Sequence, residues 1–172
     1  APQDEREIFS LEELAKEFEI ERVNKSGAIF DMNKLEWYNG YYIRHIETRD
    51  LAQRVLPFLE KAGMQVKFDD YLVNCVALVQ ERMKTLAEAP ELLDFFYELP
   101  EYDPELLIPK KSDRETTKLA LEKCYQVLKG LEDWSHDPME EQLRQASTDL
   151  GIKSGQLLWP LRAAMTGKSA SP

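Results

Sequence analysis

The chain has 172 residues, of which 43% are hydrophobic and 31% are charged, and its formal net charge at pH 7 is −10. This length suits one ordinary domain or two small ones, and the composition supports a buried core and excludes a disordered chain. A net-acidic chain also argues against a nucleic-acid partner, because contacts with phosphate supply most of the affinity for nucleic acids.

The first predicted helices lie between residues 10 and 47. Residues 10–13, SLEE, form a capping box, in which the Ser10 hydroxyl and the Glu13 carboxylate each accept from a backbone N–H, so a helix is expected from residue 11 to about residue 19. After a connector with a flexible KSG turn at residues 25–27, Asp31 is expected to cap a helix over residues 32–47. The apolar spacing places these side chains on the buried faces: Leu11, Leu14, Ala15, Phe18, Leu35, Tyr38, Tyr42, Ile43 and Ile46.

A second face of the helix over residues 32–47 carries Trp37, Tyr41 and Arg44. Aromatic rings beside an arginine are able to stack on nucleotides. The same pattern is typical of a helix that packs on two sides. Both interpretations stay open at this point.

Three helices are predicted in the next part of the chain, over residues 49–62, 70–84 and 86–97. Thr48 is expected to cap the first, which Gly63 ends, and Asp69 or Asp70 is expected to open the second. Arg82 lies one step off the apolar stripe of the second of these helices. The stripes of the first two contain Leu51, Val55, Phe58, Leu59, Ala62, Leu72, Cys75, Val76, Val79 and Met83.

Residues 98–109 hold three prolines and four acids and are expected to connect two helical lobes, with a domain boundary near Pro109. Residues 112–115, SDRE, form a second capping box for a helix through about residue 131. Asp137 and Pro138 open a helix over residues 138–150, which Gly151 ends. The inward side chains of the longer helix are expected to be Leu119, Cys124, Tyr125 and Leu128.

The basic tail, residues 142–172, has a charge opposite to that of the rest of the chain. Four cations (Arg144, Lys153, Arg162 and Lys168) face one acid, Asp149, so the tail carries +3 and residues 1–141 carry −13, the difference between −10 and +3. This asymmetry reopens the question of a nucleic-acid partner. The alternative is a capped surface helix with solvated cations. The expected apolar face of the tail helix contains Ile152, Leu157, Leu158, Leu161 and Met165.

The elements together predict an all-α protein with no repeat. Cys75 and Cys124 each fall in a helical pattern and are expected to be buried free thiols. The chain starts APQDE, without Met or an apolar signal segment, and no window approaches the roughly 18 apolar residues of a membrane span. We therefore expect a cytoplasmic protein with no membrane contact, and a piece cut from a longer chain.

Catalytic and metal motifs are missing from the sequence. His45 and His136 are its two histidines, and neither has a Cys or carboxylate at metal-ligand spacing. No GxGxxG, phosphate-binding loop, HExxH or GxSxG motif occurs. The chain by itself is expected to have no catalytic residue, no metal and no cofactor.

Two motifs resemble one family. Residues 21–31 (ERVNKSGAIFD), followed by residues 34–44 (KLEWYNGYYIR), resemble bacterial-type glutamyl-tRNA synthetase, in which this block joins the stem-contact region to the all-helical anticodon-binding half. Residues 153–172 are similar to the same family through Pro160-Leu161-Arg162-Ala163-Ala164 and Thr166-Gly167. The resemblance covers essentially the whole chain.

The resemblance implies three parts, namely the end of a stem-contact region (residues 1–47), a first anticodon-binding lobe (residues 48–109) and a second lobe truncated at its C-terminus (residues 110–172). The family's nucleotide-binding fold, with its ATP and Mg²⁺ chemistry, is expected before this segment, and the Lys25-Ser26 pair is not its KMSKS-type loop. A monomer that binds tRNA(Glu) for a class I glutamate–tRNA ligase is implied.

Seven site residues follow from the same resemblance. Arg82 resembles the arginine at the anticodon face of the first lobe, where the family distinguishes glutamate from glutamine anticodons by C or G at the third base. Positions expected to reach the anticodon from the second lobe are Arg144, Arg162 and Ser171. Positions expected to contact the tRNA backbone or stem are Arg22, Arg44 and Lys153.

Two alternatives remain beside this interpretation. An acidic all-helical adaptor that binds protein is the first, although such a protein has no need to collect its cations at one end. Glutaminyl-tRNA synthetase is the second, but that family reads its anticodon with β-barrels, and this sequence predicts no strand.

Overall fold

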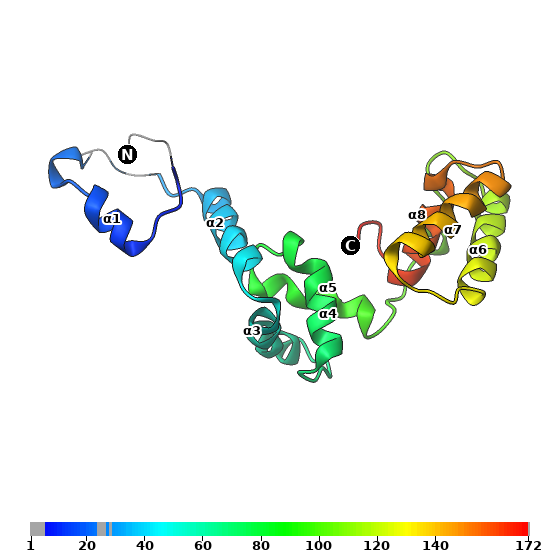
Figure 1. Ribbon diagram of the computed structural model, residues 1–172, viewed down its shortest axis with the longest axis horizontal. Helices are drawn as coiled ribbons and strands as arrows, with labels where there is room; N and C mark the ends of the chain where they lie inside the picture. Colours follow the sequence, from blue (N-terminus) through cyan, green and yellow to red (C-terminus); the bar gives the residue numbers. More distant parts are fainter. Residues whose placement is uncertain (1–5, 24–26, 28, 172) are drawn as a thin grey trace. The chain divides into compact units, whose positions relative to one another are not determined.

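A computed structural model describes residues 6–23, 27 and 29–171 of the chain (Figure 1). Within these residues it has eight α-helices, five 3₁₀ turns and no strand, which confirms the predicted all-α class. The chain divides into two compact units, one ending at Lys34 and one beginning at Leu35. Of the predicted flexible turn at residues 25–27, Lys25 and Ser26 lie outside the described residues.

The N-terminal unit contains α1 (Leu11–Glu17) and the 3₁₀ turn η1 (Ile20–Arg22). The predicted capping box is confirmed, since the Ser10 N–H donates to Glu13 Oε2 at 2.8 Å and the Glu13 N–H donates to Ser10 Oγ at 3.2 Å. The predicted burial of its apolar face is wrong, because no residue of α1 is buried and Phe18 is 67% exposed. The next element, η1, is a single turn and is too short to cover this face.

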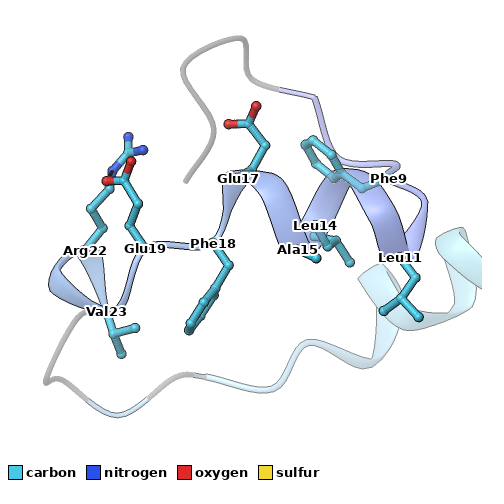
Figure 2. Close-up of a pocket in the computed structure, with 9 residues that line it drawn as sticks. All are labelled: Phe9, Leu11, Leu14, Ala15, Glu17, Phe18, Glu19, Arg22 and Val23. Atoms are coloured by element: carbon cyan, nitrogen blue, oxygen red, sulfur yellow. Dashed lines mark ion pairs between the residues drawn. The ribbon is translucent and has the colours of Figure 1, made fainter.

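The apolar side chains of α1 instead line an open groove of about 710 Å³ within the N-terminal unit. Figure 2 shows Leu11, Phe18 and Val23 pointing to one side of the ribbon, with Leu14 and Ala15 between them.

The second unit starts within α2 (Met32–His45) and continues with α3 (Thr48–Lys61), α4 (Asp70–Val79) and α5 (Ala89–Leu93). The predicted helix over residues 86–97 is in fact α5 between two 3₁₀ turns, η3 (Leu86–Glu88) and η4 (Asp94–Phe96). These elements enclose the first core, which largely confirms the predicted stripes of α3 and α4. Its buried members are Ile43, Leu51, Ala52, Val55, Leu59, Leu72, Cys75, Val76, Val79, Met83, Ala89 and Leu93.

Three predictions for this region need correction. The cap of α3 is Glu47, whose carboxylate accepts the Asp50 N–H at 2.9 Å, and Thr48 is already helical. Ala62 is exposed because it follows the last helical residue of α3. On α2 the buried residues are Gly40 and Ile43, whereas Leu35 and Tyr42 are half exposed, since only part of this helix reaches the first core.

Gln80 was not singled out by sequence reasoning, yet it is 8% exposed and joins three elements. It opens the 3₁₀ turn η2 (Gln80–Arg82) at the end of α4. Its Nε2 donates to the carbonyls of Ile43 at 2.9 Å and Ile46 at 2.8 Å, and its Oε1 accepts from the Thr48 hydroxyl at 2.9 Å. The amide therefore binds one carbonyl in the last turn of α2 and one just after it, and fixes the start of α3.

The remaining helices are α6 (Arg114–Lys129), α7 (His136–Asp149) and α8 (Ser154–Thr166), after the 3₁₀ turn η5 (Pro104–Leu107). They pack around the second core, a smaller cluster of Cys124, Leu143, Ala146 and Leu157. The proposed stop at Gly151 is confirmed, because its φ is 65° and its N–H donates to the Thr148 carbonyl.

Several expectations for these helices are wrong. Asp113, not Ser112, caps α6 by accepting the Thr116 N–H at 2.7 Å, and α7 begins at His136, one residue before Asp137. Leu119 and Tyr125 are 50% and 61% exposed, because α7 and α8 cover only the opposite, narrower face that holds Thr117, Ala120 and Cys124. On α8 the predicted face is buried at Leu157, whereas Leu158 and Met165 are exposed.

The two thiols are buried and free, as expected. Burial raises the pKa of Cys124 to about 11, and burial is also the main cause that raises the pKa of Cys75. Both are therefore protonated at neutral pH and behave as small apolar side chains. Among the described helices, none combines the length and the apolar character needed to cross a lipid bilayer.

Candidate nucleic-acid interface

The turn that ends α8 directs the C-terminal segment, residues 167–171, back toward the first core (Figure 1). Gly167 has φ 65° and donates its N–H to the Ala163 carbonyl at 2.8 Å. A Cβ at Gly167 would lie 2.6 Å from Pro100 Cγ and 3.1 Å from Tyr102 Cδ1. Glycine is therefore required twice here, by the left-handed backbone and by the close approach of residues 100–102.

Arg162 holds the C-terminal segment from α8. Its Nη2 donates to the Ser169 carbonyl at 2.7 Å, and its Nη1 lies 3.5 Å from Ser171 Oγ. The guanidinium also lies over the Trp159 ring, 4.9 Å from the centroid. Trp159 in turn donates its indole N–H to the Leu106 carbonyl at 2.9 Å. The orientation of Arg162 is thus fixed by a stacked ring and by the main chain.

Arg82 lies close to the C-terminal segment but belongs to η2, which follows α4. It is the exposed last residue of η2, a turn whose first residue, Gln80, and next residue in the chain, Met83, are both buried. A small cavity of about 80 Å³ brings Arg82 together with Ser171. The other lining residues are Glu91, Leu92, Phe95, Lys168 and Ala170. The fold therefore unites three predicted residues, Arg82, Arg162 and Ser171, which we call the arginine cluster.

Lys168 is the third basic group of this region, and its charge is compensated within the chain. Its Nζ lies 2.6 Å from Asp94 Oδ1, donates to the Glu91 carbonyl and stands over the Phe95 ring, 5.5 Å from the centroid. Only 22% of the Lys168 side chain is exposed.

Two further predicted residues lie outside the arginine cluster. Arg144 is on α7, where its guanidinium binds Glu140 Oε1 at 2.7 and 3.0 Å and borders a pocket that also contains Asp137 and Glu141. Lys153 precedes α8, at the opposite end of that 13-residue helix from Gly167, about 20 Å away along the helix axis. Its side chain is exposed.

The last two predicted residues belong to other elements. Arg22 is part of the N-terminal unit, where its Nε lies 3.7 Å from Glu19 Oε2. Arg44 is half-buried on α2, and its Nη1 would lie 3.2 Å from a Cβ at Gly40. Neither lines the cavity beside Arg82.

These cations fall into two groups, according to whether a carboxylate of the chain pairs with them. Arg144 and Lys168 are paired with carboxylates. In the part of the chain that the structure describes, Arg82 and Arg162 form no ion pair with Asp or Glu, so both keep guanidinium donors for an external acceptor. No group of three or more metal-ligating side chains occurs among the described residues.

Sequence reasoning missed Trp159, Asp94 and the pairing of Lys168. Trp159 precedes Arg162 by three residues in one helix, and this spacing places two side chains on the same face. The stacking of Arg162 on Trp159 could therefore have been predicted from the sequence. Asp94 lies 74 residues before Lys168, and their contact follows only from the fold.

The sequence profile of the anticodon binding domain family matches residues 50–172. The chain is 44% identical to the glutamate–tRNA ligase of Roseiflexus castenholzii, over 96% of this chain and 34% of that protein, and 37% identical to that of Clostridium novyi, over 99% and 36%. Its fold is similar to a crystal structure of a glutamate tRNA ligase from Elizabethkingia meningosepticum in complex with its amino acid, with a TM-score of 0.81 and 26% identity, over 99% of this chain and 34% of that one. The chain thus spans about a third of the length of these relatives.

Proposed function

This chain belongs to the anticodon binding domain family, and we propose on that premise that it binds a tRNA and reads its anticodon as part of a glutamate–tRNA ligase. Similarity to glutamate–tRNA ligases along almost the whole chain supports the assignment to that enzyme. Family membership also favours RNA binding over the protein-binding adaptor that an acidic helical chain suggested.

The arginine cluster is the observation that carries this proposal. Arg162 Nη1 lies 3.5 Å from the Ser171 hydroxyl, and Arg82 lines the same cavity as Ser171. Neither guanidinium has a carboxylate partner among the described residues, and the Trp159 ring supports Arg162. Single-stranded anticodon bases are recognised by hydrogen bonds to their pairing edges and by stacking. Arginine offers five donors and no acceptor, so the cluster suits bases that present acceptors.

Cytosine presents adjacent O2 and N3 acceptors on its pairing edge, whereas guanine presents N1–H and N2–H donors at the corresponding positions and has O6 as its one acceptor there. The donors of Arg82 therefore match a C at the third anticodon base, as in tRNA(Glu), and oppose a G. We assign Arg82, Arg162 and Ser171 to the anticodon and keep Arg144 as a further anticodon contact. Its pairing with Glu140 must open for that role.

The rest of the proposal concerns the surrounding molecule. Arg22, Arg44 and Lys153 are assigned to the tRNA backbone or stem. The chain acts as a cytoplasmic monomer without a catalytic residue, and the ATP and Mg²⁺ sites belong to the catalytic half of the parent ligase.

We expect the affinity of the chain for tRNA to decrease only moderately as the salt concentration rises. A protein of net charge −10 binds RNA through few cations, about three to five, and single-strand contacts contribute a slope of about −0.7 each, so log affinity against log salt should have a slope of roughly −2 to −4. Mobility-shift titrations at several salt concentrations measure this slope. A folded chain that shifts no tRNA at any salt concentration would reject the proposed function, and a slope near zero would reject its electrostatic basis.

A further inference from the structure

We propose that Lys168 and Asp94 are positioning residues for base discrimination, because their ion pair fixes the C-terminal segment beside Arg82. This inference rests on the proposed function. It assigns a role to two residues that need not touch the RNA.

The Lys168–Asp94 contact differs from the other ion pairs of the second unit in reach and burial. Its 2.6 Å contact joins groups 74 positions apart, and the Lys168 side chain is 22% exposed. The lysines of Lys84–Glu36 and Lys123–Asp149, which also join different helices or turns, are 61% and 35% exposed. The Lys168 ammonium makes a second hydrogen bond to the Glu91 carbonyl and lies over Phe95. Three contacts therefore hold one side chain against α5 and η4, so the geometry is more restricted than in an exposed pair.

The neighbours of Lys168 in sequence are the groups that complete the arginine cluster. Ser169 accepts from Arg162 through its carbonyl, and Ser171, 8% exposed, lines the cavity with Arg82. Arg162 itself stays on α8, held over Trp159. The ion pair thus holds the segment that follows α8 against α5 and η4, beside the cavity that Arg82 also lines.

Fixing the positions of Arg82 and Arg162 relative to each other should affect the preference for one base over another more than the overall affinity for RNA. Each guanidinium is able to bind a phosphate or a base edge without the other. Selection of one base by bidentate hydrogen bonds requires donors held within about 0.5 Å of the matching geometry. Loss of the ion pair should therefore narrow the preference for one base while the number of phosphate contacts stays the same.

The test compares Lys168→Met and Asp94→Asn with the unchanged chain on two anticodon stem-loops that differ only by C or G at the third anticodon base. We expect either substitution to reduce the C-to-G affinity ratio about three- to tenfold, with an unchanged salt slope. The double variant should lose no more than either single one. Lys168→Arg should retain the ratio, since it keeps the charge and the donors. Lys129→Met, which removes an exposed lysine over the Tyr125 ring, is the matched control and should change nothing.

A measurement without RNA separates this proposal from the function on which it rests. In Lys168→Met, amide hydrogen exchange at Gly167 and Lys168, whose N–H groups donate to the Ala163 carbonyl and the Thr166 hydroxyl, should accelerate, while exchange in the second core stays unchanged. Unchanged exchange in this segment would overturn the proposed contact whether or not the chain binds RNA. An unchanged C-to-G ratio, or equal weakening of both loops with a slope reduced by about one phosphate contact, would show that Lys168 is not a positioning residue. If the unchanged chain binds neither loop, the proposed function fails, and the exchange result still decides the contact.

Discussion

Replacing Arg82 with glutamine is expected to narrow the preference for C over G at the third anticodon base by about 1–3 kcal/mol, the range for arginine contacts with base edges. Arginine presents only donors, which match cytosine and oppose guanine. Glutamine carries one donor and one acceptor and is able to pair with either base. Equilibrium binding of two anticodon stem-loops that differ only at that base measures the change.

Lys153→Ala is the control for this substitution. Lys153 is exposed at the far end of α8 and does not line the cavity beside Arg82, so its loss should weaken both stem-loops alike. An unchanged C-to-G ratio in Arg82→Gln would remove this residue from the reading site. A ratio that falls equally in both variants would mean that the discrimination does not come from the arginine cluster.

Replacing Gln80 with methionine is expected to lower the free energy of unfolding by about 2–4 kcal/mol. Methionine has a similar volume but donates no hydrogen bond, so the Ile43 and Ile46 carbonyls and the Thr48 hydroxyl would each lose the hydrogen bond to the Gln80 amide. Urea denaturation followed by circular dichroism measures the change. Gln53→Met, on the exposed side of α3, should change the unfolding free energy by less than about 0.5 kcal/mol. Equal effects of the two substitutions would contradict the role given to Gln80.

The helices were predictable because capping and apolar spacing are local signals. Ser10 caps α1 as predicted, and the cap of α6 is Asp113, one residue after the predicted Ser112. The apolar stripes of α3 and α4 were also largely right, since both helices face the first core. The stripe of α1 was wrong because sequence spacing identifies an apolar face but not whether another element covers it.

The residues of the candidate site were proposed one by one from the sequence, but their arrangement was not. Resemblance to a family pointed to Arg82, Arg162 and Ser171, which come from distant parts of the sequence. Their proximity depends on the turn at Gly167 and on the Lys168–Asp94 pair, which are tertiary contacts without a local pattern. The net positive charge of the basic tail overstated the number of cations that can bind RNA, because Arg144 and Lys168 are paired with acids.

Anticodon reading is tested most directly by titrating the chain with tRNA(Glu) and with the same tRNA whose anticodon loop is replaced by a short, unrelated loop. If the arginine cluster reads the anticodon, the altered tRNA should bind at least tenfold more weakly at moderate salt, about 1.4 kcal/mol, while the remaining affinity reflects backbone contacts. Equal affinity for the two RNAs would contradict anticodon reading by this chain.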